Sequence, residues 1–224
     1  MHLRTLWSVT VAAAVRYETT MPSMSLLNEY QIPIAVETLA SAFQNDPLYR
    51  FVIPDPEMRS TFLQLFFAFR IRYGMKFGEV HCTSERGEGV AVWIPFQSVK
   101  MTYPRIIQGG GLTVLRAVDA DIRKKLFELQ EFAEDARERI RGPYWHLAPI
   151  AVHPAHQGHG LASLLIRSML ARLDREQSAC TLETQNSKNV AIYERYGFKT
   201  VSERLMPGSD VHHWLMLRDV RPLP

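Results

Sequence analysis

The feature that most constrains this chain is an apolar segment that leads through a glycine-bearing loop into an amphipathic helix. Residues 145–152 are apolar and short enough to form a strand, which ends at His153-Pro154 because proline cannot donate to a sheet ladder. Gly158 and Gly160 follow, and then leucines and a methionine recur at helical spacing. A helix N-terminus leaves about four backbone N–H groups without partners, so this arrangement predicts a site for an anion such as a diphosphate.

Three kinds of phosphate-binding loop place glycines in front of a helix. A P-loop needs Lys and then Ser or Thr after its last glycine, whereas Leu-Ala follows Gly160, which excludes this kind. A dinucleotide fingerprint fits Gly158 and Gly160 and has Glu183 at about the right distance downstream. However, Ser163 stands in its third glycine place, and five residues separate Val152 from Gly158. This fingerprint stays the weaker alternative.

The third kind is the acyl-CoA loop of the Gcn5-related N-acetyltransferases (GNAT), with the pattern Gln/Arg-x-x-Gly-x-Gly/Ala. Gln157, Gly160 and Ala162 fill its three fixed places, and residues 189–198, N-V-A-I-Y-E-R-Y-G-F, are similar to the next signature of that family. Over residues 144–217 the expected order of strand, loop, helix, strand, helix and hairpin resembles the GNAT core. These sequence motifs are most similar to those of puromycin N-acetyltransferase-like small-molecule acetyltransferases.

The resemblance implies a fold and a donor. The implied fold is α/β (α+β), with a mixed central sheet, helices on both faces, and a parallel strand pair that splays apart to hold acyl-CoA. The implied co-substrate is acetyl-CoA, without a metal. Two departures affect the phosphate site, because His159 stands where Arg or Lys is common and Ala162 replaces the more frequent Gly. The cofactor-binding residues implied are Ile150, Ala151, Val152, Gln157, Gly158, His159, Gly160, Leu161, Ala162 and Asn189.

Amine acetylation needs a proton acceptor for the ammonium, a donor for the oxyanion and an acid for the departing thiolate. The N–H of Val152 or its neighbour is the implied oxyanion donor, and Tyr193 matches the acid position of the family, with simple packing on the cofactor as the alternative. Glu183 is the first candidate for the base, and binding the acceptor's ammonium or pairing with a nearby Arg is an equal alternative. His146 is interpreted as a core residue. A bound water chain can replace a dedicated base.

The length of 224 residues favours one domain with an insertion over two independent domains. We expect the domain at residues 23–224 and a helical insertion at about 104–141, which closes over the acceptor side. Within the insertion, apolar residues at alternating steps of four and three predict an amphipathic helix over residues 119–141.

Other elements are expected from local patterns. An aromatic helix begins with Asp55 as its cap and Pro56 as its first residue, ends at Gly74, and forms core packing or, alternatively, a wall of the acceptor pocket. The remaining expectations are a strand in residues 25–30, a helix ending before Asp46-Pro47, an apolar segment over the core at 48–53, a hairpin of 79–83 and 90–95, a strand at 180–184, a helix at 188–196 capped by Ser187 and ended by Gly197, and a hairpin of 200–205 and 211–217.

Charge and cysteine usage limit the partners and the compartment. The formal net charge of +3 has no basic run behind it, so nucleic acid is not an expected partner, and neither is a membrane. Two cysteines without metal spacing suggest a reducing, cytoplasmic location, although a disulfide stays open. Residues 1–22 are interpreted as an extension or a mispredicted start, and a weak targeting peptide is the alternative.

The sequence therefore predicts an acetyl-CoA-dependent N-acetyltransferase. It would transfer acetyl to a primary amine of a small or xenobiotic molecule by direct attack in a ternary complex, as a monomer or homodimer. The alternatives are an acetyltransferase for protein N-termini or lysines and a non-catalytic acyl-CoA-binding module.

Overall fold

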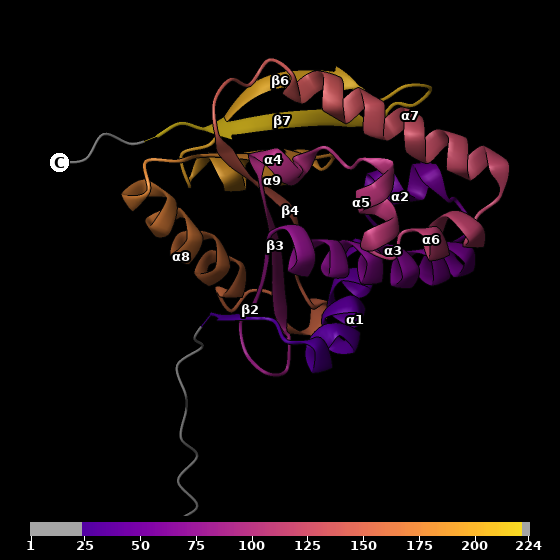
Figure 1. Ribbon diagram of the computed structural model, residues 1–224, viewed down its shortest axis with the longest axis horizontal. Coiled ribbons are helices and arrows are strands. Elements are labelled where there is room, and N and C mark those ends of the chain that lie inside the picture. The colour runs from indigo at the N-terminus through magenta and orange to yellow at the C-terminus, as the bar shows by residue number, and fades with distance from the viewer. Residues whose placement is uncertain (1–23, 221–224) are drawn as a thin grey trace, which may run out of the picture.

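The computed structural model describes residues 24–220, whose strands form one seven-stranded mixed sheet in the order β1-β2-β3-β4-β5-β7-β6 (Figure 1). Only β4 and β5 pair in parallel, and every other neighbouring pair is antiparallel. This confirms the predicted fold class. The strands are β1 (Ser25–Leu26), β2 (Glu79–Cys82), β3 (Gly89–Pro95), β4 (Tyr144–Val152), β5 (Ala179–Thr184), β6 (Lys199–Leu205) and β7 (His212–Arg218).

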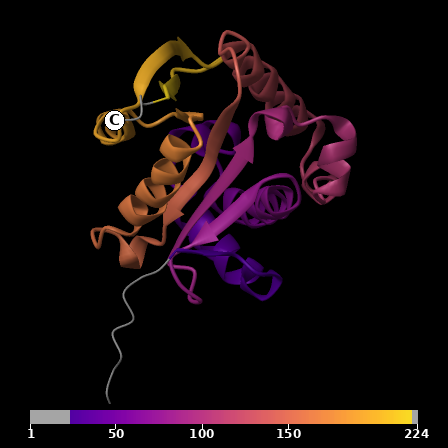
Figure 2. The same ribbon diagram turned by 60° about the vertical axis from the view of Figure 1, so that its left-hand side comes forward.

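Helices cover both faces of this sheet, as Figure 2 shows with α8 on one side and α1 and α3 on the other. Two separate apolar clusters fill the two interfaces. The helices are α1 (Ile32–Phe43), α2 (Pro47–Val52), α3 (Pro56–Phe77), α4 (Phe96–Val99), α5 (Tyr103–Gln108), α6 (Leu112–Ala117), α7 (Ala120–Arg137), α8 (Leu161–Arg175) and α9 (Ser187–Glu194), with short 3-10 turns η1 (Glu29–Gln31) and η2 (Pro154–His156).

Two Asp-Pro pairs start consecutive helices. The Asp55 carboxylate accepts a hydrogen bond from the Met58 backbone N–H (2.7 Å), and Pro56 begins α3, as predicted. Asp46 caps α2 in the same way through the Leu48 N–H (3.0 Å). The apolar segment expected at 48–53 is therefore a helix.

Gly74 does not end α3, which continues to Phe77, so this prediction was wrong. A Cβ atom at Gly74 would lie 2.5 Å from Val92 Cγ1 and 2.8 Å from Val80 Cγ2. The glycine allows the helix to approach the sheet closely, and a glycine inside a helix is indistinguishable from a stop signal when only the sequence is read.

Three other boundaries differ from the predictions. The strand expected in 25–30 is only two residues long, because Asn28 and Gln31 form a capping box that starts a 3-10 turn. The cap of α9 is Asn186 and not Ser187, since its side chain accepts from the Lys188 N–H (3.1 Å). The long insertion helix α7 ends at Arg137, before residue 141.

The parallel pairing of β4 with β5 runs from Tyr144–Ala179 only to Leu147–Leu182. Beyond Leu147, β4 stays paired with β3 alone, and the register with β3 shifts between Ala91 and Trp93. Pro149 lies in this stretch and has no N–H to donate. The two central strands thus splay apart, as the resemblance implied.

The insertion between β3 and β4 comprises α4 to α7, and α7 lies along β6 and β7 in Figure 1. Arg204 of β6 holds α7 through Asp135 (2.7 Å) and the Phe132 carbonyl (3.0 Å). Arg137 forms a further ion pair with Glu183 of β5. These contacts fix the insertion over one end of the sheet.

Three further expectations concern the cysteines, a membrane and the N-terminal extension. Cys82 and Cys180 are both buried and free, without a disulfide between them. Between residues 24 and 220, no helix combines the length and apolarity that crossing a bilayer requires. The extension expected at 1–22 lies outside the described residues.

Candidate active site

The free part of β4 exposes backbone groups toward the gap left by β5. The His153 N–H donates to the Glu88 carbonyl (2.8 Å), and the next pair along the ladder is Val152 opposite Gly89. Because ladder bonds alternate in direction along an antiparallel pair, the N–H groups of Val152 and Ile150 point away from β3. The Gln157 side-chain amide donates to the Val152 carbonyl (3.1 Å). The open edge of β4 therefore lies where pantetheine was expected. The Val152 N–H lies where the donor to the oxyanion was expected.

The glycine-bearing loop presents an open helix N-terminus. Gly158 (φ 83°) and Gly160 (φ 79°) both have left-handed backbones, and a Cβ atom at either would meet nothing within 4 Å. The first hydrogen bond of α8 joins the Leu164 N–H to the Gly160 carbonyl (3.0 Å). The N–H groups of the preceding residues 161–163 are thus available to a ligand, and the first turn carries no acid that would compensate the helix dipole. The residues present fit a diphosphate.

His159 and Asn189 complete the expected set of donor-site residues. His159 is exposed, and its Nδ1 lies 3.3 Å from the His156 carbonyl oxygen. The Asn189 side chain donates to Thr184 Oγ1 (3.3 Å), which places it at the end of β5.

Tyr193 lies on α9 and packs edge-on against Phe198, with ring centroids 6.0 Å apart. Burial raises the pKa of its hydroxyl above the usual range, and Tyr196 and Asp46 add to this effect. The hydroxyl therefore stays protonated at neutral pH, as a general acid must.

Asp46-Pro47 was interpreted only as the pair before which a helix ends, yet the Asp46 carboxylate is a second acid–base group that acts on Tyr193. Burial raises the pKa of Asp46 to about 6, although hydrogen bonds from the Leu48 and Tyr49 N–H groups oppose the shift. Its charge in turn raises the pKa of Tyr193. A carboxyl group with a pKa near 6 can accept a proton at neutral pH. Sequence alone gave no signal for this, because an Asp-Pro pair already has a sufficient explanation as a helix cap.

Glu183 lies in an ion pair. Burial raises the pKa of its carboxyl, but Arg137 and His213, whose Nε2 lies 3.3 Å from Oε2, more than offset this and hold the pKa well below the usual range. A carboxylate that binds protons so weakly is a poor base. The geometry thus favours the alternative in which Glu183 pairs with an arginine. The Nδ1 of His146 lies 2.9 Å from Thr181 Oγ1, and burial lowers the His146 pKa to about 3, which fits a neutral core residue.

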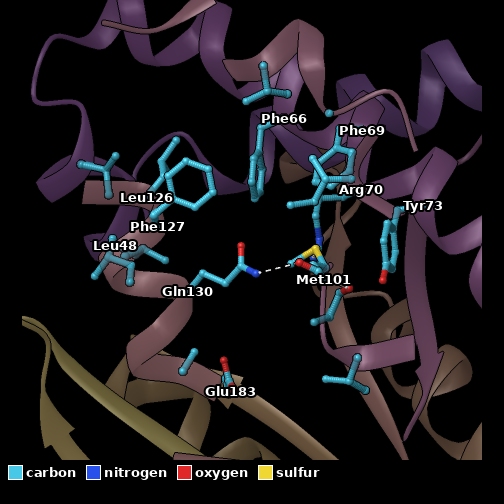
Figure 3. Close-up of a pocket in the computed structure, with 18 of the residues that line it drawn as sticks. Leu48, Phe66, Phe69, Arg70, Tyr73, Met101, Leu126, Phe127, Gln130 and Glu183 are labelled. Carbon is cyan, nitrogen blue, oxygen red and sulfur yellow. Dashed lines mark hydrogen bonds between the residues drawn. The ribbon is translucent and has the colours of Figure 1, made fainter. Parts of the chain in front are cut away.

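A partly open cavity of about 230 Å³ lies beside the splay, between α3, the insertion and the ends of β4 and β5 (Figure 3). Ala148, the first residue beyond the last β4–β5 pair, lines it. Its apolar wall includes Leu48, Phe66, Phe69, Leu126 and Phe127. Its polar groups are Arg70, Gln130, Arg137, His146, Glu183, Gln185 and His213. The aromatic stripe of α3 thus serves both as core and as pocket wall.

Comparison with known proteins agrees with this geometry. A family profile described as "Acetyltransferase (GNAT) domain" matches residues 127–200, which contain the free end of β4, the glycine loop and Tyr193. GNAT acyltransferases use acetyl-CoA and acylate small-molecule or protein acceptors.

Several solved structures share the fold. One from Corynebacterium glutamicum, described as histone acetyltransferase HPA2 and related acetyltransferase, has a TM-score of 0.64 at 23% identity and covers 91% of this chain and 99% of its own. Arylalkylamine N-acetyltransferase 2 from Aedes aegypti has a TM-score of 0.56 at 14% identity, with 88% and 98% covered. The polyamine N-acetyltransferase of Drosophila melanogaster has a TM-score of 0.56 at 11% identity, with 88% and 99% covered. Residues 127–200 thus match the GNAT acetyltransferase family, and the chain shares its fold with solved acetyltransferases.

Proposed function

We propose that this protein transfers the acetyl group of acetyl-CoA to a primary amine of a small molecule by direct attack in a ternary complex. One observation carries the proposal. The splay beyond Leu147 lies between an open, glycine-bearing helix N-terminus and a cavity that Ala148 lines. A donor bound in the splay would thus present its acetyl group to an acceptor in the cavity.

The proposed donor site uses backbone groups. The N–H groups at the start of α8 would bind the diphosphate, because the helix dipole favours negative charge there. The free edge of β4 would pair with the pantetheine arm, and Asn189 would bind the same arm from the other side of the gap. The residues proposed for this site are Ile150, Ala151, Val152, Gln157, Gly158, His159, Gly160, Leu161, Ala162 and Asn189.

The proposed chemistry needs no covalent intermediate on the enzyme. Asp46, which lies next to the cavity-lining residues Leu48 and Tyr49, accepts the proton of the acceptor's ammonium through a water, and the amine nitrogen then attacks the thioester carbonyl carbon. The N–H of Val152 donates to the oxyanion. When the C–S bond breaks, Tyr193 gives its proton to the thiolate. Glu183, first considered as the base, instead keeps Arg137 and His213 in place at the floor of the cavity.

The small volume of the cavity, about 230 Å³, supports a small acceptor over a protein. Residues of α5, α6 and α7 line it, so the insertion forms one wall of the proposed acceptor site. We propose that this insertion and the sheet act together as one domain, with its acceptor site completed by the insertion.

A CoA-release assay over a panel of amines tests the proposal. We expect release with small primary amines and none with peptides that carry a free N-terminus or a lysine. Release with peptides alone would favour a protein acetyltransferase. Binding of acetyl-CoA without release from any acceptor would favour a non-catalytic module.

A further inference from the structure

Arg70 brings a positive charge into the cavity without an acidic partner. Its Nη2 donates to the Ala148 carbonyl (2.9 Å), and its Nη1 lies 3.1 Å from the Met101 sulfur. None of the ion pairs between side chains of residues 24–220 includes Arg70. Both partners of this guanidinium are therefore neutral.

The charges that line the cavity do not balance. They are the guanidinium groups of Arg70 and Arg137 and the carboxylate of Glu183, and Glu183 already pairs with Arg137 and His213. His146 is neutral because burial lowers its pKa to about 3. A guanidinium stays protonated in proteins, and a largely buried charge without a counter-charge is unfavourable. A ligand with an anionic group would remove this imbalance.

The position of Arg70 sets where that anionic group would lie. Ala148, which accepts its hydrogen bond, directly follows the last residue of β4 that pairs with β5. The guanidinium thus sits at the mouth of the splay, where the proposed transfer takes place. An anion bound there would lie close to the reacting amine. This is the geometry of an α-amino acid, whose amine and carboxylate share one carbon.

The rest of the cavity fits a large apolar side chain. Figure 3 shows Phe66, Leu126 and Phe127 around the space on the side away from Glu183. Aromatic walls of this kind favour aromatic or bulky aliphatic groups. A polyamine, in contrast, would bring further positive charge next to Arg70 and Arg137.

We propose that the acceptor is an α-amino acid with a large apolar or aromatic side chain, and that Arg70 binds its carboxylate. This inference rests on the proposed N-acetyltransferase function. It makes Arg70 the residue that distinguishes an amino acid from a simple amine of the same shape.

The test compares L-phenylalanine with L-phenylalaninol, in which a hydroxymethyl group replaces the carboxylate. For the wild type we expect kcat/KM from CoA release to favour phenylalanine by about tenfold or more, as for a hydrogen-bonded charge pair. In Arg70→Leu the ratio of the two kcat/KM values should fall toward one, and Arg70→Lys should restore part of it. The matched control is Arg72→Leu, which removes an exposed arginine from the same helix and should keep the wild-type ratio.

Two results would overturn the inference. One is a wild type that turns over phenylalaninol as well as or better than phenylalanine. The other is an Arg70→Leu variant that slows both acceptors equally, which would assign Arg70 a structural role through Ala148. Absence of CoA release with every amine would instead reject the proposed function. In that case, binding of N-acetyl-phenylalanine in the presence of CoA, measured by calorimetry, still decides the role of Arg70, since loss of Arg70 should weaken it about tenfold.

Discussion

The two sides of the splay are built in opposite ways. On the proposed donor side, residues 157–162 are contiguous in sequence, mostly exposed, and offer backbone N–H groups. On the acceptor side, the cavity is assembled from side chains of α2, α3, the insertion, β4, β5 and β7. A backbone site needs only the correct local conformation, whereas a side-chain site needs many distant segments packed together.

The two sides also differ in how far protein side chains compensate their charges. At the donor loop no side chain caps α8, so the positive end of the helix is left for a ligand. In the cavity, Arg137, Glu183 and His213 largely compensate one another, and only Arg70 is left over. We therefore expect substitutions in the loop to change binding without much loss of stability, and substitutions in the cavity network to change stability first.

The largest effect should come from Glu183→Gln in the cavity. The side chains of Arg137 and Glu183 are 11% and 15% exposed, so the substitution leaves a mostly buried guanidinium without its counter-charge and should cost about 3–5 kcal/mol of unfolding free energy at pH 7. Because folding lowers the Glu183 pKa, its contribution is complete above the unfolded value of about 4.3 and is lost as pH falls below it. Denaturant unfolding at pH 7 measures the free energy lost in the variant. The same experiment at pH 3.5 measures how much of the Glu183 contribution is lost on acidification. Glu138→Gln, at an exposed position, is the control. A loss under about 1 kcal/mol for Glu183→Gln would contradict the expectation that cavity substitutions change stability first.

Gly160→Trp should abolish donor binding. The bulky side chain would occupy the open space in front of α8 and should weaken acetyl-CoA binding by more than about 100-fold, or about 2.7 kcal/mol. Gly208→Trp is a matched control, because Gly208 also has a positive φ (68°) and open space but lies in the β6–β7 turn. Calorimetry should show wild-type affinity for the control. Equal affinity for both variants would remove the loop from the donor site.

Tyr193→Phe should reduce kcat by about 100-fold, at the lower end of the range for general acid catalysis, and leave acetyl-CoA affinity unchanged. The reason is that the ring still packs against Phe198 while the proton donor is lost. Tyr196→Phe, three residues along the same segment, is the control. If both variants lose the same activity, the hydroxyl of Tyr193 has no special role.

Asp46→Asn should have the smallest effect, a loss of about tenfold in kcat/KM at pH 7, because water can take over the proton. In the wild type, kcat/KM should fall below about pH 6 as Asp46 becomes protonated, and this limb should be absent from the variant. Since folding raises the Asp46 pKa, the stability that this group contributes is lost as pH rises through about 6. Asn is an equally good cap, so the variant should melt at the same or a higher temperature at pH 7.5.

Asp55→Asn is the control for that experiment, because it changes the equivalent cap of α3 at an exposed position. It should leave both the pH profile and the activity unchanged. An acid limb that persists in Asp46→Asn would exclude Asp46 as the base and favour a water chain without a dedicated carboxylate.

Local patterns were enough to predict much of the fold. The glycine loop and its helix, the Asp55-Pro56 start of α3 and the β2–β3 hairpin each depend on residues a few positions apart, and the structure confirms them. Gly74 and the cap of α9 were misread because their explanation lies in a neighbouring strand or in a choice between adjacent capping residues.

The sequence by itself therefore determined the fold class and the position of the glycine loop at the start of α8, because backbone conformation near glycine and proline is a local property. Only the tertiary structure decided which residues line the proposed acceptor cavity. Arg70 meets Ala148 across 78 residues, and Arg137 meets Glu183 across 46. Charge partners at such separations leave no periodic signal, and the pKa values of Asp46 and Glu183 depend on burial and neighbours that exist only after the chain has folded.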